Sequence, residues 1–307
     1  MRLRVFRIAC FLMAAGVASV ALADELDDSL AALKEAQAKK DAALIKKLGA
    51  ETSALAKKAI ETPAPAAADE KEAWKAHVDY AKNVQLQADY IVYSLAAESE
   101  PETTLELMAA LEQQNPKSKY LDEGGYATYF TALERTGASA KVIPIAEKAL
   151  ASLPDCPDLL FVLANAAARK QQSDKTLTYS NRLTATMTKR SKPEGMSAAD
   201  WEKKKNELLG GGYYMAGMVY GQRDQYVNAD KTLRAALPFI KGTDAMMGPA
   251  LYYLGVANYK LGMMTNAKAK VQAGVDFSEQ SAKIVSPLQS QALKNSWIMK
   301  GDLAKMR

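Results

Sequence analysis

The chain has 307 residues, enough for a sizeable core or an extended repeat array, and its 49% hydrophobic and 24% charged residues are typical of a soluble folded protein. The formal net charge of +5 falls to +2 if the three arginines of residues 1–23 are removed. This gives no support to nucleic-acid binding, which needs a clustered basic surface. The single histidine, His77, and the two cysteines exclude a catalytic triad and a zinc site.

Residues 1–23 have the pattern of a secretory signal peptide. Three arginines precede the apolar stretch "IACFLMAAGVASVALA", which ends in the small-x-small sequence Ala21-Leu22-Ala23. We therefore predict cleavage after Ala23 and export to a bacterial periplasm, or secretion. An uncleaved anchor is the alternative, and it would be the only membrane contact, although the stretch is short for a spanning helix. After cleavage Cys156 is the only cysteine, so no internal disulfide can form, and we expect its thiol to be half-buried and inert.

Residues 24–61 are predicted to form an N-terminal amphipathic helical segment. Its leucines recur at steps that return to one face of a helix, although Gln37 and Lys40 interrupt the stripe. The segment is one helix, or two with a break near Gly49. It either packs on its own domain or serves as a coiled-coil or docking arm through which the chain forms a homo-oligomer. The leucines of the stripe are Leu26, Leu30, Leu33, Leu44 and Leu48.

A short stiff linker is predicted over residues 62–69, because its two prolines cannot continue a helix. A second helical stretch follows from Glu70 to about Glu98. The residues spaced for its buried face are Trp74, Val78, Ala81, Leu86 and Ile91.

From here the chain repeats a set of intervals. Small or apolar residues follow Gly217 by 12, 16 and 19 positions, and the same intervals recur after Gly255, with Gly262 expected at the turn. Weaker copies begin at Val92, Phe130 and Ala164. The spacing predicts two helices joined by a tight turn, with small residues where the helices cross, and pairs that stack because each alone exposes an apolar face. The residues at these intervals after Gly217 and Gly255 are Ala229, Leu233 and Ala236, and Ala267, Val271 and Gly274.

These intervals resemble the tetratricopeptide repeat over about residues 85–281. The best match is Tyr213, Ala216-Gly217, Tyr220, Tyr226, Ala229, Leu233 and Ala236-Leu237, and the second is Leu251, Leu254-Gly255, Gly262, Ala267 and Val271. Departures from the pattern are Phe130, Thr176 and Asn258. The resemblance implies an all-α fold, a right-handed α-solenoid. About five helical hairpins would cover residues 70–281, between the N-terminal helical arm and a C-terminal capping helix over residues 282–307.

An insertion near residues 190–209 interrupts the repeats. Pro193 and Gly195 predict a loop, and Ser197 followed by Asp200 predicts a helix N-cap. Trp201, Leu208 and Leu209 are expected to anchor that helix. The three glycines of residues 210–212 indicate a long helix with a flexible or kinked joint where another helix packs closely. The alternative is an anion site at a helix N-terminus, which a small-molecule-binding protein or an enzyme would use.

The last helix is predicted from Pro287 to about Lys305, as a cap on the array. Terminal repeats need a polar outer face. Lys294, Asn295, Lys300 and Asp302 would supply that face, with Leu293 and Trp297 turned inward.

The sequence has no dinucleotide or phosphate loop and no pattern of catalytic, cofactor-binding or metal-binding residues. We therefore predict a non-enzymatic scaffold of the bacterial envelope that binds a protein or peptide partner in a concave groove lined by the first helices. Tyrosine and arginine suit such recognition because they supply contact area and directed hydrogen bonds. The predicted groove residues are Thr131, Arg135, Asn165, Arg169, Tyr214, Met218, Gln222, Tyr252, Tyr259 and Lys260.

Overall fold

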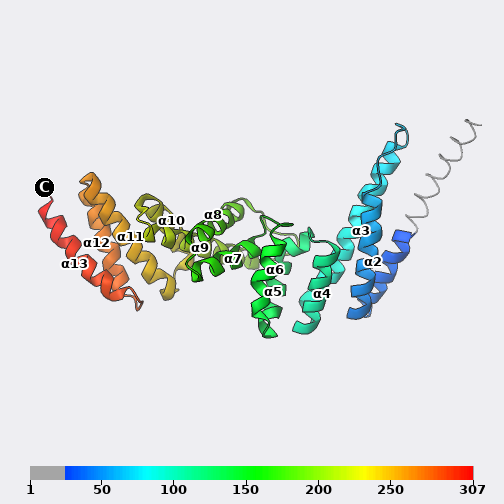
Figure 1. The fold of residues 1–307 in the computed structure, drawn as a ribbon, viewed down its shortest axis with the longest axis horizontal. Coiled ribbons are helices and arrows are strands. Elements are labelled where there is room, and N and C mark those ends of the chain that lie inside the picture. Colours follow the sequence, from blue (N-terminus) through cyan, green and yellow to red (C-terminus); the bar gives the residue numbers. More distant parts are fainter. Residues whose placement is uncertain (1–24, 307) are drawn as a thin grey trace, which may run out of the picture. The chain divides into compact units, whose positions relative to one another are not determined.

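A computed structural model describes residues 25–306, which form helices joined by turns and loops (Figure 1). No strand occurs between residues 25 and 306, so the predicted all-α class is confirmed for this part of the chain. Within the same range, no helix combines the length and apolar character that a membrane span needs. The predicted signal peptide, with its cleavage site after Ala23, lies outside the described residues.

The chain divides into two compact units, Met1–Val142 and Ile143–Arg307, here called unit 1 and unit 2. In unit 1, a helix over residues 25–38 is followed by α2 (Ala42–Ile60), α3 (Lys71–Glu98), α4 (Pro101–Gln114), η1 (Leu121–Gly125), α5 (Tyr126–Arg135) and η2 (Ser139–Lys141). From the boundary onward come α6 (Val142–Ala149), α7 (Pro157–Arg169), α8 (Ser173–Lys189), α9 (Ala198–Gln222), α10 (Tyr226–Ile240), α11 (Asp244–Thr265), α12 (Lys268–Ala282) and α13 (Gln289–Lys305).

The N-terminal segment forms two helices, and the break falls at residues 39–41 rather than near Gly49. Lys40 has a positive φ of 51°, which ends the first helix. Asp41 then caps α2, because its side chain accepts a hydrogen bond of 3.0 Å from the backbone N–H of Leu44. Gly49 lies inside α2, where a β-carbon would come within 2.7 Å of Val92 on α3. Gly49 therefore allows close approach of two helices and does not end one.

This turn splits the predicted leucine stripe. Leu26, Leu30 and Leu33 are buried, whereas Leu44 is 36% exposed and Leu48 is half-buried. The change of helical phase across residues 39–41 turns the second half of the stripe to the outer side. The segment packs on α3 through one core cluster, formed by Leu26, Leu30, Ala56, Ala59, Ala81 and Val84.

Helix α3 begins one residue after the predicted start and ends at Glu98 as predicted. Leu86 was wrongly placed in its core and is 38% exposed, because it lies five residues after Ala81 and so points to the other side of the helix. Val84, three residues after Ala81, takes the buried position instead. Trp74 is half-buried, and its Nε1 donates a hydrogen bond of 3.0 Å to the carbonyl of Thr62, which ties the linker to α3.

Five helix–helix turns share one backbone conformation. In each, a residue with positive φ follows the first helix, and the next backbone N–H donates to the carbonyl five residues earlier. This is the Schellman arrangement, which satisfies the last carbonyls of a helix. Three of these turns lie seven residues after a sequence marker, the residue from which one copy of the repeated intervals is counted. The turns are at Gly137, Gln171 and Asp224, and the markers are Phe130, Ala164 and Gly217. The five residues with positive φ are Lys40, Gly137, Gln171, Asp224 and Asn266.

Gly262 was expected at the last of these turns and is instead inside α11, four residues before Asn266. Helix α11 is thus extended by about one turn. At Gly262 a β-carbon would come within 2.7 Å of the backbone nitrogen of Val271. Gly217 has a similar role, since a β-carbon there would lie 2.5 Å from Leu233 on α10. Both glycines are found where two helices cross closely, as the repeat spacing predicts for Gly217.

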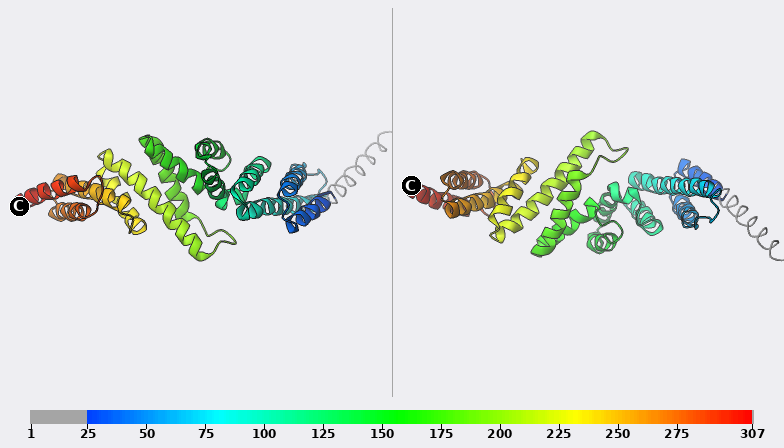
Figure 2. Two further views of the ribbon diagram at one scale, coloured as in Figure 1. Left: turned by 90° about the horizontal axis from the view of Figure 1, so that it is seen from below. Right: turned by 90° about the horizontal axis from the view of Figure 1, so that it is seen from above.

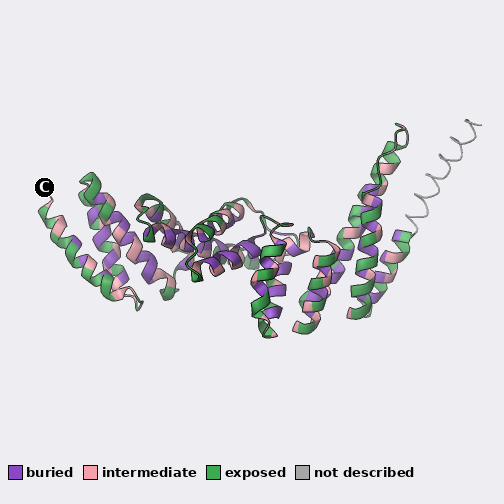
Figure 3. Ribbon diagram, viewed as in Figure 1, coloured by how far each residue is buried: buried purple, intermediate pink, exposed green. Residues whose placement is uncertain are grey.

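In unit 2, consecutive helices from α7 to α13 contact one another (Figure 2). The alternate helices α7, α9, α11 and α13 also contact one another in that order. Helix α9 contacts α7, α8, α10 and α11, and α11 contacts α9, α10, α12 and α13. In unit 1, the contact between alternate helices joins α2 and α4. The buried residues follow the sides on which these contacts occur (Figure 3).

The insertion lengthens the start of α9. Gly195 has a φ of 81° in the loop, and the Ser197 side chain accepts a hydrogen bond of 3.0 Å from the Asp200 backbone N–H, so the predicted N-cap is confirmed. The expected anchors are buried: they form a core with side chains of α7 and α8. These anchors are Trp201, Leu208 and Leu209.

The three glycines lie in the interior of α9 and face three different helices. A β-carbon would come within 2.8 Å of Phe239 at Gly210, 2.5 Å of Phe161 at Gly211 and 2.7 Å of Thr184 at Gly212. Backbone N–H groups in a helix interior already donate within the helix. The anion site at a helix N-terminus is therefore wrong for these residues, which are the point where α7, α8 and α10 approach α9.

Helix α13 exposes Lys294 and Lys300 as predicted, but its predicted inner face is wrong. Leu293 is 50% exposed and Trp297 is 71% exposed, although both were expected to turn inward. The buried residues are the smaller Ala292 and Ser296, with Met299. The reason is helical phase, because Ala292, Ser296 and Met299 are four and three residues apart and form one stripe on the side of α13 that faces α11 and α12.

Candidate interaction surface

The ten predicted groove residues lie on α5, α7, α9 and α11 and so divide between the two units. Thr131 and Arg135 are exposed on α5 in unit 1. The Thr131 hydroxyl donates 2.8 Å to the carbonyl of Ala127, a hydrogen bond within its own helix. The other eight residues belong to unit 2.

In unit 2, α7, α9 and α11 form one layer, because α9 contacts both of the others. The predicted residues follow each helix at steps close to whole turns, which places them in stripes. Arg169, Gln222 and Lys260 are exposed. The half-buried members of the layer are Asn165, Tyr214, Met218, Tyr252 and Tyr259.

A tyrosine that the sequence reasoning missed joins two of these stripes. Tyr253 on α11 lies over Gly221 on α9, where a β-carbon would come within 2.5 Å of its ring. Its ring also meets that of Tyr252 edge to face, with centroids 5.1 Å apart. Burial raises the pKa of Tyr253, and a side-chain hydrogen bond with Gln222 acts in the opposite direction. The signal that could have revealed it is Gly221, a glycine one residue before Gln222 in a helix.

Tyr214 lies close enough to Tyr253 for that residue to affect its pKa. Burial is the main cause that raises the pKa of Tyr214, and the neighbouring Tyr253 adds to the effect. The centre of the layer is therefore an aromatic cluster of Tyr214, Tyr252 and Tyr253 with the amide of Gln222 beside it. Such a cluster provides contact area with few rotatable bonds and a small number of polar groups.

Tyr259 is already engaged within the protein. Its hydroxyl donates a hydrogen bond of 2.7 Å to Asp302 Oδ2 on α13, and this bond is the main cause that raises the pKa of Tyr259. The Lys260 ammonium lies 5.9 Å from the Tyr259 ring centroid. Tyr259 therefore attaches the last helix, and the part of the layer open to a partner lies nearer to α9.

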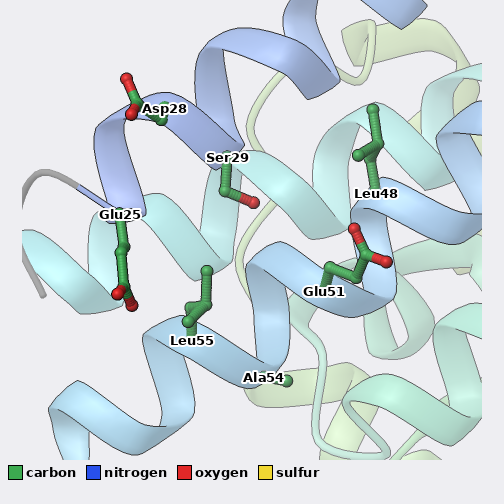
Figure 4. A pocket seen from close by; sticks show the side chains of 7 residues that line it. All are labelled: Glu25, Asp28, Ser29, Leu48, Glu51, Ala54 and Leu55. Atoms are coloured by element: carbon green, nitrogen blue, oxygen red, sulfur yellow. The ribbon is translucent and has the colours of Figure 1, made fainter.

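Two hollows in the surface lie elsewhere. One, of about 580 Å³, is a groove between the helix over residues 25–38 and α2 (Figure 4). The other, of about 260 Å³, lies beside the turn between α9 and α10. Neither includes any of the ten predicted residues. The groove of Figure 4 is lined by Glu25, Asp28, Ser29, Leu48, Glu51, Ala54 and Leu55.

The described residues offer little for metal or thiol chemistry. Between residues 25 and 306, no three His, Cys, Asp or Glu side chains form a group that would hold a metal ion. Cys156 was expected to be half-buried and is instead completely buried at the N-cap of α7. His77 is half-buried on α3.

Several buried polar residues were not predicted. Asp89 is 1% exposed on α3 and accepts hydrogen bonds from Gln114 Nε2 at 3.0 Å and Asn115 Nδ2 at 2.7 Å. Burial raises the pKa of Asp89, against the opposite effect of the bonds from Ser118, Asn115 and Gln114. These bonds join α3 to the end of α4, so Asp89 has a structural role.

Asn258, a departure from the repeat pattern, is also structural. It is buried on α11, where its Nδ2 donates to Asp230 Oδ1 at 2.6 Å and its Oδ1 accepts from Arg234 Nη2 at 3.0 Å. Both partners lie on α10. A buried amide with its partners satisfied fixes the register of two helices.

No family model matches the chain, and a comparison with curated protein sequences finds no match either.

Proposed function

We propose that this protein is an exported, non-enzymatic scaffold with helical hairpins of the tetratricopeptide type, and that it binds an extended segment or a helix of a partner protein. The partner would lie along the layer of α7, α9 and α11. The hairpin turns support the repeat assignment, since three of them fall seven residues after the sequence markers. A stack of hairpins exposes one side of successive first helices, which suits recognition of extended partners.

One observation carries the choice of this face. The half-buried cluster of Tyr214, Tyr252 and Tyr253 spans α9 and α11, and Gln222 lies beside it on α9. Arg169 is exposed on α7, the next helix of the layer. Binding energy in protein interfaces is concentrated in aromatic and arginine side chains. The layer therefore has apolar anchors at its centre and polar groups around them.

The test uses two residues of this layer, Arg169 on α7 and Tyr252 on α11. We expect Arg169→Ala combined with Tyr252→Ala to weaken partner capture from envelope extracts by about tenfold or more, because each side chain is of a type that dominates interfaces. Quantitative mass spectrometry of the captured proteins gives the readout. The matched control is Val227→Ala with Lys231→Ala, two exposed residues of α10. Equal capture by the groove variant and the unchanged chain would remove the assignment.

Self-assembly through residues 24–61 is a second candidate, favoured by one specific observation. The leucines of α2 that face outward, Leu44 and Leu48, are followed by half-buried Leu55 at the same side of the helix. Leu48 and Leu55 form the apolar floor of the groove in Figure 4. An apolar floor on the outer side of the first hairpin is a surface that a further helix would cover.

A further inference from the structure

The last helix carries an unpaired apolar ridge. Leu293, Trp297, Gly301 and Ala304 follow one another at steps of four, four and three residues, and all four are exposed. Ile298, also exposed, widens the ridge. Residues at these steps share one face of a helix, the geometry that helices use to pack on one another.

Gly301 indicates that the ridge lacks a closely packed second helix. Glycine inside a helix is less favourable than alanine, so a packing reason is expected. At every other glycine of the described α-helices, a β-carbon would meet a neighbouring side chain or backbone. At Gly301 a β-carbon meets nothing within 4 Å. By the pattern of this chain, Gly301 marks a helix crossing whose second helix is missing from the described residues of unit 2.

Stacking inside unit 2 shows how such a crossing is filled. Helix α9 contacts both α7 and α8, α11 contacts both α9 and α10, and α13 contacts both α11 and α12. In each case a single helix lies against a pair joined by a turn. The other side of α13 faces no such pair within unit 2.

The groove of Figure 4, in unit 1, lies between two helices that form a pair of this kind. The helix over residues 25–38 and α2 are joined by the turn at Lys40, and the Ser29 and Thr52 hydroxyls are 2.7 Å apart across them. Leu48, Ala54 and Leu55 form its apolar floor (Figure 4). A groove between two paired helices is a surface on which the ridge of a third helix packs.

The charges around the two surfaces are opposite. Three carboxylates, those of Glu25, Asp28 and Glu51, surround the groove. On α13 the residues beside the ridge include exposed Lys294 and Lys305, of which Lys305 lies 3.4 Å from Asp302 on the same helix. Pairing two α13 helices would bring lysines together, whereas pairing α13 with the groove brings lysines to carboxylates. Complementary charges fix the partner and the orientation of such a contact.

We infer that the protein assembles head to tail, with α13 of one copy seated in the groove between residues 25–38 and α2 of the next copy. This inference rests on the second candidate function, self-assembly through residues 24–61, and is independent of the segment-binding layer. The contact uses two different surfaces, so a pair of copies retains one free groove and one free α13. Association therefore continues beyond a dimer.

Two variants each block one surface. The full chain is expressed with its own N-terminal segment and studied by sedimentation velocity over a wide range of concentration. We expect the unchanged chain to form a concentration-dependent series of species, and both Leu48→Asp and Trp297→Asp to be monomeric. An equal mixture of the two variants should form one discrete dimer, because the intact α13 of the first fits the intact groove of the second. Met264→Asp, at an exposed residue of α11, is the control and should associate like the unchanged chain.

Each of the other outcomes shows which part of the inference is wrong. A monomeric unchanged chain overturns the inference and the second candidate together. Loss of association in Leu48→Asp but not in Trp297→Asp overturns only the assignment of α13, and the reverse result indicates that α13 pairs with itself. A mixture of the two variants that stays monomeric also overturns the head-to-tail contact, provided that circular dichroism shows both variants folded.

The charges give a further check. Lys294→Glu and Glu51→Lys should each weaken association about fivefold, as expected for an exposed ion pair. A mixture in which Lys294→Glu is carried with Leu48→Asp, and Glu51→Lys with Trp297→Asp, should recover the dimer. No recovery would contradict a contact between Lys294 of one copy and Glu51 of the next.

Discussion

Asp89 illustrates how one buried residue sets a dependence on pH. Its carboxyl group is almost completely removed from water, which raises its pKa from the ordinary 3.8. Because the pKa is higher in the folded chain than in the unfolded chain, the folded state binds the proton more tightly. The resulting stabilisation is fully present below the unfolded pKa and is lost as pH rises through the folded pKa.

We therefore expect Asp89→Asn to change stability in a pH-dependent way. The difference in free energy of unfolding between variant and unchanged chain should shift in favour of the variant as the pH rises from acid to neutral. Urea unfolding at a series of pH values gives this difference. Asp79→Asn, at an exposed residue of the same helix, is the control and should change stability by less than about 0.5 kcal/mol. If the variant instead loses stability relative to the unchanged chain as the pH rises, the raised pKa of Asp89 is contradicted.

At the scale of elements, the insertion is attached to its neighbours by charge as well as by apolar contacts. Lys204, in the lengthened part of α9, lies 2.8 Å from Asp158 Oδ2 in the first turn of α7. Only 21% of the lysine side chain and 7% of the aspartate side chain are exposed. Screening by water is weak at such a site, so loss of one partner destabilises the protein more than it would in a surface pair.

Removing the lysine should destabilise unit 2. We expect Lys204→Met to lower the free energy of unfolding by about 2 kcal/mol, because it leaves the buried Asp158 carboxylate without its charged partner. Lys203→Met, at an exposed position one residue earlier, should change it by less than about 0.5 kcal/mol. Thermal or urea unfolding compares the two variants, and equal effects would show that the pair contributes nothing specific.

The sequence predicted helices well where spacing alone determined them. The helix after the proline linker, the N-cap at Ser197 and the crossing at Gly217 follow from local chemistry and intervals, and the structure confirms them. It failed where a single turn resets the phase: Lys40 has no signal for a positive φ, so Leu44 and Leu48 were placed on the wrong side.

The candidate surface was predictable in part. Regular spacing located the stripes on α7, α9 and α11, because solvent-facing residues of a helix recur with its period. Tyr253 and the Tyr259–Asp302 bond were missed, since each depends on which helix lies opposite. Leu293 and Trp297 were misplaced for a different reason: the assumption of a polar cap outweighed the stripe of Ala292, Ser296 and Met299.

At the scale of the whole molecule, the predicted export sets the compartment in which we expect a partner. The pattern of residues 1–23 predicts cleavage after Ala23. We expect the chain recovered from the envelope fraction to begin at Asp24, as read by N-terminal sequencing or intact mass. Ala21→Asp with Ala23→Asp should block processing, because the cleavage site requires small residues. A recovered chain that begins at Met1 would indicate an anchor instead.

The glycine-rich centre of α9 has a consequence for how unit 2 comes apart. Helices α9 and α11 each contact four other helices, so neither can separate from unit 2 without breaking all of these contacts. Among the described helices, α13 contacts only α11 and α12. Fraying should begin at the chain's last helix and move inward, one hairpin at a time. If α13 is also the joint between copies, assembly protects the part of the molecule that would otherwise open first.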